Sequence, residues 1–215
     1  MRVKICCIQS IAEARMAVDA GADLLGLVGA MPSGPGPIGD ERISEIAEWT
    51  PPGVASVLLS SETTAGGLIA HVARCRPAVL QIVDEPEPGA RAAVRAAHPG
   101  VKLMQVIHVE DESAIDAAKA AADADAILLD SGHPSATVKE LGGTGRAHDW
   151  SISARLVEAA DRPVFLAGGL KTSNIVEAIR AVRPFGIDLC SGVRTDDRLD
   201  PAKLATFFEA VRAAG

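Results

Sequence analysis

Short apolar runs alternate along the whole chain with longer alanine-rich segments of helical character. The apolar runs contain few polar positions, as buried parallel strands do, since both faces of such a strand are covered. We expect strands at 3–7, 23–28, 54–59, 78–83, 101–106, 126–130, 164–167 and 186–190. We expect helices at 11–20, 40–49, 63–74, 86–97, 112–122, 151–160, 172–182 and 201–213.

This alternation makes eight strand–helix units in 215 residues, with no composition break or low-complexity linker between them. Eight such units are typical of a (β/α)8 barrel, or TIM barrel, so residues 1–215 are expected to form a single α/β domain. A doubly wound open sheet is the competing architecture. It usually has fewer units and carries a glycine-rich turn after its first strand. Here that turn reads "CCIQS", which favours the barrel; Ser10 is the expected N-cap of the helix that follows.

Composition narrows the class of protein. Hydrophobic residues make up 48% of the chain and aromatic residues only 3%, so the core must be aliphatic. The net charge of -7 argues against nucleic-acid partners. The absence of a long apolar run argues against a membrane span, and no signal peptide is evident. We therefore expect a cytoplasmic protein.

The four cysteines are Cys6, Cys7, Cys75 and Cys190. They lack the paired spacing of a zinc site and are too few for a disulfide framework in a chain of this length. Reduced thiols and no metal site are the expectation.

In a (β/α)8 barrel the active site lies at the C-terminal ends of the strands. Several polar or reactive residues and glycines follow the expected strands directly. They are Cys6, Cys7, Gln81, Asp84, His108, Asp130, His133, Gly168, Gly169, Ser191 and Gly192.

Two glycine motifs end the last two strands, "LAGGL" with Gly168 and Gly169 and "CSGVR" with Ser191 and Gly192. Glycine allows backbone N–H groups to approach an anion closely, and these two loops often bind phosphate in barrels. A single glycine pair would indicate only a tight turn. Two motifs in adjacent loops predict a phosphate site.

Strand alternation indicates which side chains face the barrel interior. If Asp130 points inward, Leu128 does too, while Leu129 packs beneath helices. On the first strand Lys4 and Cys6 share one face, which we take as the interior, and Cys7 is expected to face the helices. Asp130 is then a candidate general acid and Cys6 a candidate base. The alternatives are that Asp130 caps a turn and that Cys6 is a small core residue.

Several stretches resemble one enzyme family throughout the chain. "VKICCI", "DAGADLLGLV", "AILLDS" and "GGTGRAHDW" are similar in order and spacing to motifs of the phosphoribosylanthranilate isomerases, and 166–194 resembles their last two units almost throughout. The resemblance implies a (β/α)8 fold and an Amadori rearrangement of N-(5′-phosphoribosyl)anthranilate in tryptophan biosynthesis, without metal or organic cofactor. It implies that Asp130 protonates the ring oxygen, that Cys6 removes the C2′ proton, and that Gly168, Gly169, Ser191 and Gly192 hold the phosphate.

The sequence departs from the family where the anthranilate end would bind. The family's Ser-Arg pair after the second strand is missing from the loop "GAMPSGPGPIGDER", and its "QLHG" motif after the fourth strand is replaced by "LQIVDE". The glycine after the catalytic cysteine is Cys7. Lys171, Arg194 and Arg146 are candidate substitutes for the lost positive charge.

These departures leave alternatives open. One is a related barrel that acts on a different phosphorylated sugar, and another is a non-catalytic binder of a phosphorylated metabolite. A third is a barrel whose loops contact a partner, for which the Pro/Gly-rich segment 31–39 is a candidate; this segment is expected to be either a lid or a plain connector. Gln81, His108 and His133 are expected substrate contacts, whereas His71 and His98 are expected on the surface. The chain is expected to be a monomer or a homodimer, without nucleic-acid or membrane partners.

Overall fold

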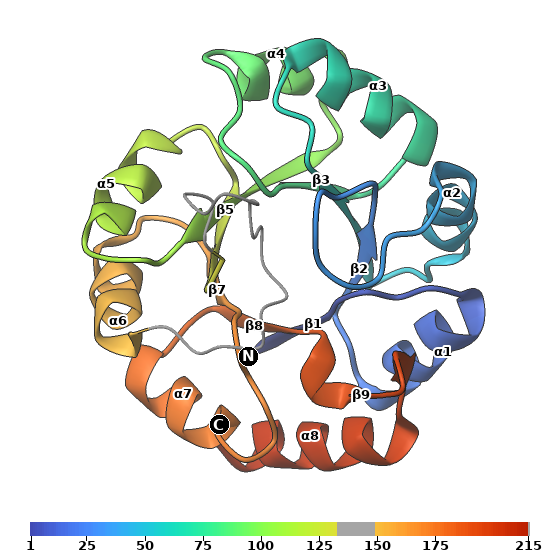
Figure 1. Cartoon of the computed structure of the whole chain (residues 1–215), viewed down its shortest axis with the longest axis vertical. Coiled ribbons are helices and arrows are strands. Elements are labelled where there is room, and N and C mark those ends of the chain that lie inside the picture. Colours follow the sequence, from blue (N-terminus) through green and yellow to red (C-terminus); the bar gives the residue numbers. More distant parts are fainter. Residues whose placement is uncertain (133–148, 215) are drawn as a thin grey trace.

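The computed structural model, which describes residues 1–132 and 149–214, is a closed barrel of eight parallel strands surrounded by helices (Figure 1). Each strand pairs with the next in the chain, and β1 pairs with β8 to close the ring. This confirms the expected fold class. The strands are β1 (Arg2–Ile5), β2 (Leu24–Val28), β3 (Ala55–Ser60), β4 (Val79–Ile82), β5 (Lys102–His108), β6 (Ala126–Asp130), β7 (Val164–Leu166) and β8 (Gly186–Leu189).

The helices form the outer ring in Figure 1. They are α1 (Ile11–Ala20), α2 (Asp40–Trp49), α3 (Ala65–Cys75), α4 (Ala90–Ala97), α5 (Ser113–Ala120), α6 (Trp150–Ala159), α7 (Ile175–Val182) and α8 (Pro201–Ala214). Ser10 caps α1 as expected, because its Oγ accepts a hydrogen bond from the backbone N–H of Glu13 at 3.2 Å.

The hydrophobic core has two parts, as alternation along buried strands requires. One lies between strands and helices and includes Ile127 and Leu129. The other fills the barrel interior and includes Leu128 and Cys6. The inward set expected for β6 is therefore confirmed, and Lys4 is fully buried inside the barrel with Cys6.

Two helices, α4 and α7, begin three or more residues later than the sequence suggested, and the short elements after β8 were not expected. Helix α4 begins at Ala90, after Gly89 in a left-handed conformation with φ 84°, rather than near Pro86. Helix α7 begins at Ile175 rather than at Thr172. After β8 the chain forms a short helical turn, η1 (Ser191–Val193), and a small hairpin of β9 (Arg194–Thr195) and β10 (Arg198–Leu199).

The expectation that His71 lies on the surface was wrong. His71 is only 4% exposed, because it lies on the face of α3 that also buries Leu68, Val72 and Cys75. His98 is half-buried at the end of α4. Among the described residues, no helix has the length and apolar character needed to cross a membrane.

Candidate active site

A pocket lies at the C-terminal ends of the strands and collects most of the residues singled out in the sequence. Those that line it are Cys6, Cys7, Gln81, Asp130, Gly168, Gly169 and Ser191. The segment after β2 also contributes to the wall, through Met31, Ser33, Gly34 and Pro35. Part of the Pro/Gly-rich segment 31–39 is therefore a wall of the pocket rather than a plain connector.

A buried ion pair that the sequence analysis did not identify reaches this pocket through one of its two residues. Lys4 Nζ donates a hydrogen bond to Asp188 Oδ2 at 2.8 Å, and Asp188 is itself a lining residue. The two residues are direct neighbours in the register of β1 and β8. The sequence did contain a signal for the pair, since Asp188 is the one charged residue of β8 and strand alternation placed the charged Lys4 inside the barrel.

The pair changes the electrostatics of the pocket. Burial is the largest influence on the pKa of Lys4 and lowers it, but the charges and hydrogen bonds of Asp188 and Cys6 together outweigh burial. The pKa of Lys4 is therefore raised and its ammonium stays charged. Burial raises the pKa of Asp188 despite Lys4, and the nearby charge of Asp130 raises it further. Two carboxyl groups, those of Asp130 and Asp188, therefore line this pocket, and Lys4, which is paired with Asp188, lies buried behind the lining.

Cys6 lies next to this cation. Burial raises the pKa of the Cys6 thiol to about 11, while the charge of Lys4 lowers it. Room for both side chains comes from Gly26 on β2: a Cβ there would lie 2.8 Å from Cys6 Sγ and 3.1 Å from Lys4 Nζ. Cys6 is thus a neutral thiol at neutral pH. It lies beside the positive charge of Lys4, which favours its thiolate form.

Asp130 ends β6 and is half-buried. Its Oδ1 accepts a hydrogen bond from the backbone N–H of Ser131 at 2.7 Å, so Asp130 caps the turn that follows β6, as one of the two expectations stated. The carboxyl group nevertheless borders the pocket that Cys6 lines. Both the acid and the thiol expected from the sequence therefore face one cavity.

The glycine loops after β7 and β8 flank the same pocket. Gly168 and Gly169 have φ of 79° and 62°, conformations that side chains rarely adopt, and a Cβ on Gly168 would lie 2.7 Å from Ser131 Oγ. Gly192 does not line the pocket; a Cβ there would lie 2.5 Å from the backbone oxygen of Leu170. Its role is to let the loops after β7 and β8 pack together.

The expectation of four reduced cysteines was wrong, because Cys7 and Cys190 form a disulfide. They are 183 positions apart in sequence, yet closure of β1 against β8 brings their Cα atoms to 5.9 Å. Cys7 does not face the helices either. Its φ of 63° is left-handed, which ends the strand alternation and turns the residue toward the pocket. Glycine adopts this conformation without strain.

Three of the other residues that follow the expected strands do not line the pocket or lie beyond the described residues; two of them, His108 and His133, were expected substrate contacts. His108 ends β5 and its Nε2 lies 3.0 Å from the backbone oxygen of Val83; it does not line the pocket. Asp84 is likewise absent from the lining. His133 lies outside the described residues.

Two of the three residues that were candidates to replace the family's missing positive charge can be placed in the structure. Arg194 is buried and pairs with Glu13 Oε2 at 3.0 Å, and it donates a hydrogen bond to the backbone oxygen of Cys7, so its charge is committed outside the pocket. Lys171 is exposed and absent from the lining, and Arg146 lies outside the described residues. Among the described lining residues there is no lysine or arginine.

Comparison with known proteins agrees with this geometry. The model of the N-(5′-phosphoribosyl)anthranilate isomerase family matches residues 3–210. The chain is 35% identical over 213 residues to the N-(5′-phosphoribosyl)anthranilate isomerase of Methanocella arvoryzae, covering 98% of each chain. It is similar to the crystal structure of the Thermus thermophilus phosphoribosyl anthranilate isomerase, with a TM-score of 0.84, 29% identity and 100% coverage of both chains.

A second structure of a phosphoribosyl anthranilate isomerase contains reduced 1-(o-carboxyphenylamino)-1-deoxyribulose 5-phosphate. It matches with a TM-score of 0.79 and 25% identity over 99% of both chains. The family model covers nearly the whole chain, and the similarity in sequence and in structure extends over the full barrel. The chain therefore belongs to the N-(5′-phosphoribosyl)anthranilate isomerase family.

Proposed function

We propose that this chain converts N-(5′-phosphoribosyl)anthranilate into 1-(o-carboxyphenylamino)-1-deoxyribulose 5-phosphate, a step of tryptophan biosynthesis, with Cys6 and Asp130 as its catalytic residues. The observation that carries the proposal is that a thiol at the end of β1 and a carboxyl group at the end of β6 line one pocket. An aldose-to-ketose rearrangement needs such a pair, an acid for the ring oxygen and a base for the adjacent carbon.

In the first step Asp130 donates a proton to the furanose ring oxygen. The C1′–O bond breaks, and the lone pair of the anthranilate nitrogen forms a C=N bond, which gives a cationic Schiff base. Asp130 is left as a carboxylate. Its position at a strand end, with one oxygen bonded to the backbone N–H of Ser131, leaves the other oxygen for the substrate.

In the second step the Cys6 thiolate removes the C2′ proton. The C–H electrons form the C1′=C2′ bond and neutralise the Schiff base, which gives an enolamine that tautomerises to the ketone. The pKa of Cys6, raised by burial to about 11, leaves little thiolate at neutral pH in the free protein. Lys4 favours the thiolate, and the cationic Schiff base would favour it further, since a nearby positive charge lowers a thiol pKa.

The substrate phosphate is proposed to bind backbone N–H groups of Gly168, Gly169 and Ser191. These residues lie in the two loops that often bind phosphate in barrels and line the same pocket as the catalytic pair. Gly192 supports the cradle by allowing the loops to pack. Gln81, whose Oε1 is buried without a hydrogen-bond partner, is a proposed contact of the sugar hydroxyls. We further propose a cytoplasmic enzyme that is a monomer or a homodimer.

A second candidate is a related reaction on a phosphorylated sugar without an anionic aglycone. The observation that favours it is the lack of lysine or arginine among the described lining residues, because the anthranilate carboxylate would lack a charge-assisted partner there. A hydrogen bond to a charged group is worth about 1.5–3 kcal/mol.

The test supplies phosphoribosylanthranilate to the purified protein and follows the loss of its fluorescence. We expect turnover by the wild type and a fall in kcat of about 10²–10⁴-fold in Cys6→Ala and Asp130→Asn. Folded wild-type protein without turnover would exclude the named substrate and favour the second candidate. Turnover that survives both substitutions would refute the assigned residues.

A further inference from the structure

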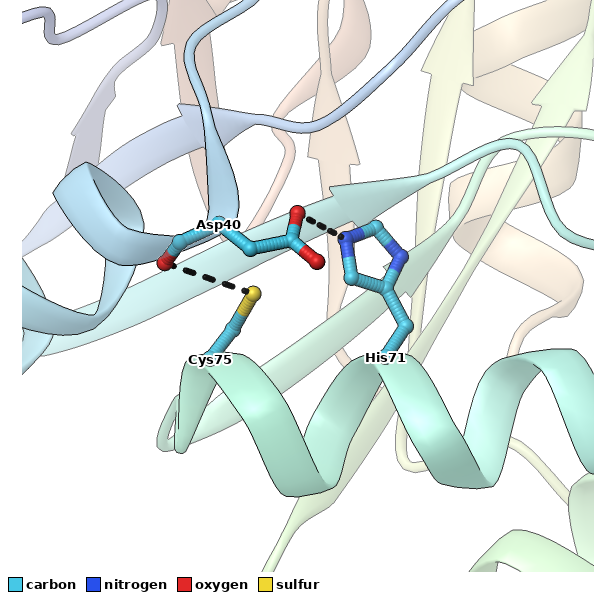
Figure 2. Close-up of side chains that lie close together, drawn as sticks. All are labelled: Asp40, His71 and Cys75. Carbon is cyan, nitrogen blue, oxygen red and sulfur yellow. Dashed lines mark hydrogen bonds and ion pairs between the residues drawn. The ribbon is translucent and has the colours of Figure 1, made fainter.

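Three side chains of types that can bind a metal ion lie close together outside the active-site pocket, between helices α2 and α3. Asp40 is the first residue of α2, and His71 and Cys75 lie four residues apart on one face of α3 (Figure 2). One ligand atom from each, an oxygen, a nitrogen and a sulfur, lies within 4.8 Å of the other two. No role in the isomerisation requires these residues, since none of them lines the pocket.

The donors suit one class of ion. Cysteine sulfur, histidine nitrogen and a carboxylate oxygen are the ligands of tetrahedral zinc, which often adds a water to three protein ligands. Bond lengths of about 2.0–2.3 Å place tetrahedral ligand atoms about 3.3–3.8 Å apart. His71 Nε2 already lies 3.3 Å from Asp40 Oδ1. Figure 2 draws this contact as a dashed line and shows the Cys75 sulfur directed toward the backbone oxygen of Asp40.

An independent observation on His71 also points to a ligand. Its Nε2 is buried, and its contact with Asp40 Oδ1 at 3.3 Å is an ion-pair contact without the geometry of a hydrogen bond. Buried polar atoms without a hydrogen bond are uncommon and costly. The other ring nitrogen, Nδ1, is held by Ser60 Oγ at 2.8 Å, which is how proteins orient a histidine that binds a metal.

The surroundings leave access and hold the ligands in place. A Cβ on Gly29 would lie 2.6 Å from His71 Cε1, so the imidazole is packed tightly in one orientation. Asp40 is about one-third exposed, which leaves room for water as a fourth ligand. Arg74 Nε lies 2.6 Å from Asp40 Oδ2 and uses the other carboxylate oxygen, so Oδ1 stays available.

We propose that Asp40, His71 and Cys75 form a binding site for a zinc-class divalent transition-metal ion, with water as the fourth ligand. Binding releases the Cys75 thiol proton to solvent and replaces the contact of that thiol with the Asp40 backbone oxygen. Burial raises the pKa of Cys75 to about 12 in the metal-free protein, so metal binding weakens as the pH falls.

The site has a structural consequence for the pocket. Asp40 directly follows segment 31–39, part of which walls the active site. A metal ion that joins Asp40 to α3 would anchor the end of that segment. This inference does not depend on the proposed reaction, because binding is measured without substrate.

The experiment titrates the metal-free protein with Co²⁺ as a spectroscopic probe. Reductant is omitted so that Cys7 and Cys190 stay paired. We expect one ion per chain, visible absorption of tetrahedral Co²⁺, and a near-ultraviolet band from thiolate-to-metal charge transfer. Added Zn²⁺ should displace the cobalt and abolish both signals.

Variants assign the ligands. Cys75→Ser should lose the charge-transfer band, and Asp40→Asn, a change at a partly exposed position, should weaken binding at least about tenfold. Ser60→Ala should weaken binding about 10–100-fold, since it removes the partner that orients His71. His98→Ala and Cys6→Ser are the control variants. They remove a histidine and a free thiol that lie outside the cluster, so both should bind cobalt as the wild type does.

Two outcomes would overturn the proposal. One is a wild-type protein that binds neither Co²⁺ nor Zn²⁺ at micromolar concentrations. The other is a charge-transfer band that persists in Cys75→Ser or disappears in Cys6→Ser, which would place the metal at another thiol. Circular dichroism of each variant establishes that it is folded, and Asp40→Asn keeps the test decisive if a core variant unfolds.

Discussion

Lys4 and Asp188 face each other inside the barrel with Nζ and Oδ2 2.8 Å apart, on the two strands that close the ring. The pair lies next to Cys6, whose thiolate the Lys4 charge favours. Breaking a buried pair by removing one partner costs about 3–5 kcal/mol, since the other charge is left uncompensated. The arrangement therefore links the stability of barrel closure to the chemistry at the end of β1.

Lys4→Met should impair both activity and stability. Loss of the ammonium removes the charge that lowers the Cys6 pKa, so that pKa should rise above about 11 and the alkaline rise of kcat/KM should move to higher pH. The free energy of unfolding should fall by about 3–5 kcal/mol. The measurements are the pH profile of turnover and urea denaturation.

The double variant Lys4→Met/Asp188→Leu separates the two effects. Removing both charges should restore most of the lost stability, because no buried charge is left unpaired, but it should not restore turnover. A double variant that regains wild-type kcat/KM would contradict the role given to Lys4.

Gly26→Ala should damage the active site more than the fold. The new methyl group would lie 2.8 Å from Cys6 Sγ and 2.9 Å from its Cα, so the thiol must shift. Overpacking costs about 1–3 kcal/mol, and a shift of about 1 Å can lower turnover about 10²-fold. Gly66→Ala, at an open position within α3, is the matched control. It should keep full activity and gain about 0.5–1 kcal/mol of stability.

The disulfide should stabilise the closed barrel. Cys190→Ala is expected to lower the free energy of unfolding by about 2–4 kcal/mol, because the bond closes a long loop of chain in the unfolded state. Dithiothreitol should destabilise the wild type by a similar amount and leave Cys190→Ala unchanged. The control Cys75→Ser should keep the sensitivity to dithiothreitol. Equal effects of the reductant on Cys190→Ala and wild type would argue against the bond.

The buried thiols should make the protein lose stability at alkaline pH. The pKa of Cys6 rises from 9.0 to about 11 on folding, so its contribution is complete below pH 9 and is lost as the pH rises to about 11. A pKa difference of this size corresponds to about 3 kcal/mol of unfolding free energy. Denaturant unfolding at several pH values between 8 and 11 measures the loss. Cys6→Ala should show a clearly smaller loss over the same interval, and an identical slope would contradict the burial of a neutral thiol.

The alternation of apolar runs and helices predicted the barrel because burial acts on each segment locally. A parallel strand covered on both faces must be apolar wherever it lies in the sheet, so β6 could be recognised from 126–130 alone. The inward direction of Asp130 and Cys6 followed from the same rule, since successive residues of a strand point to opposite faces. Two helix starts were predicted too early, because α4 begins only after Gly89 and α7 only after the turn that ends before Ile175.

Contacts between distant segments could not be predicted in this way. The bond between Cys7 and Cys190 depends on closure of β1 against β8, and the left-handed backbone at Cys7 breaks the alternation on which its predicted direction rested. The cluster of Asp40, His71 and Cys75 joins the start of one helix to the face of another. Local sequence patterns carry the strand and helix periods and thereby the fold. Which distant side chains meet is decided by how the elements pack in three dimensions.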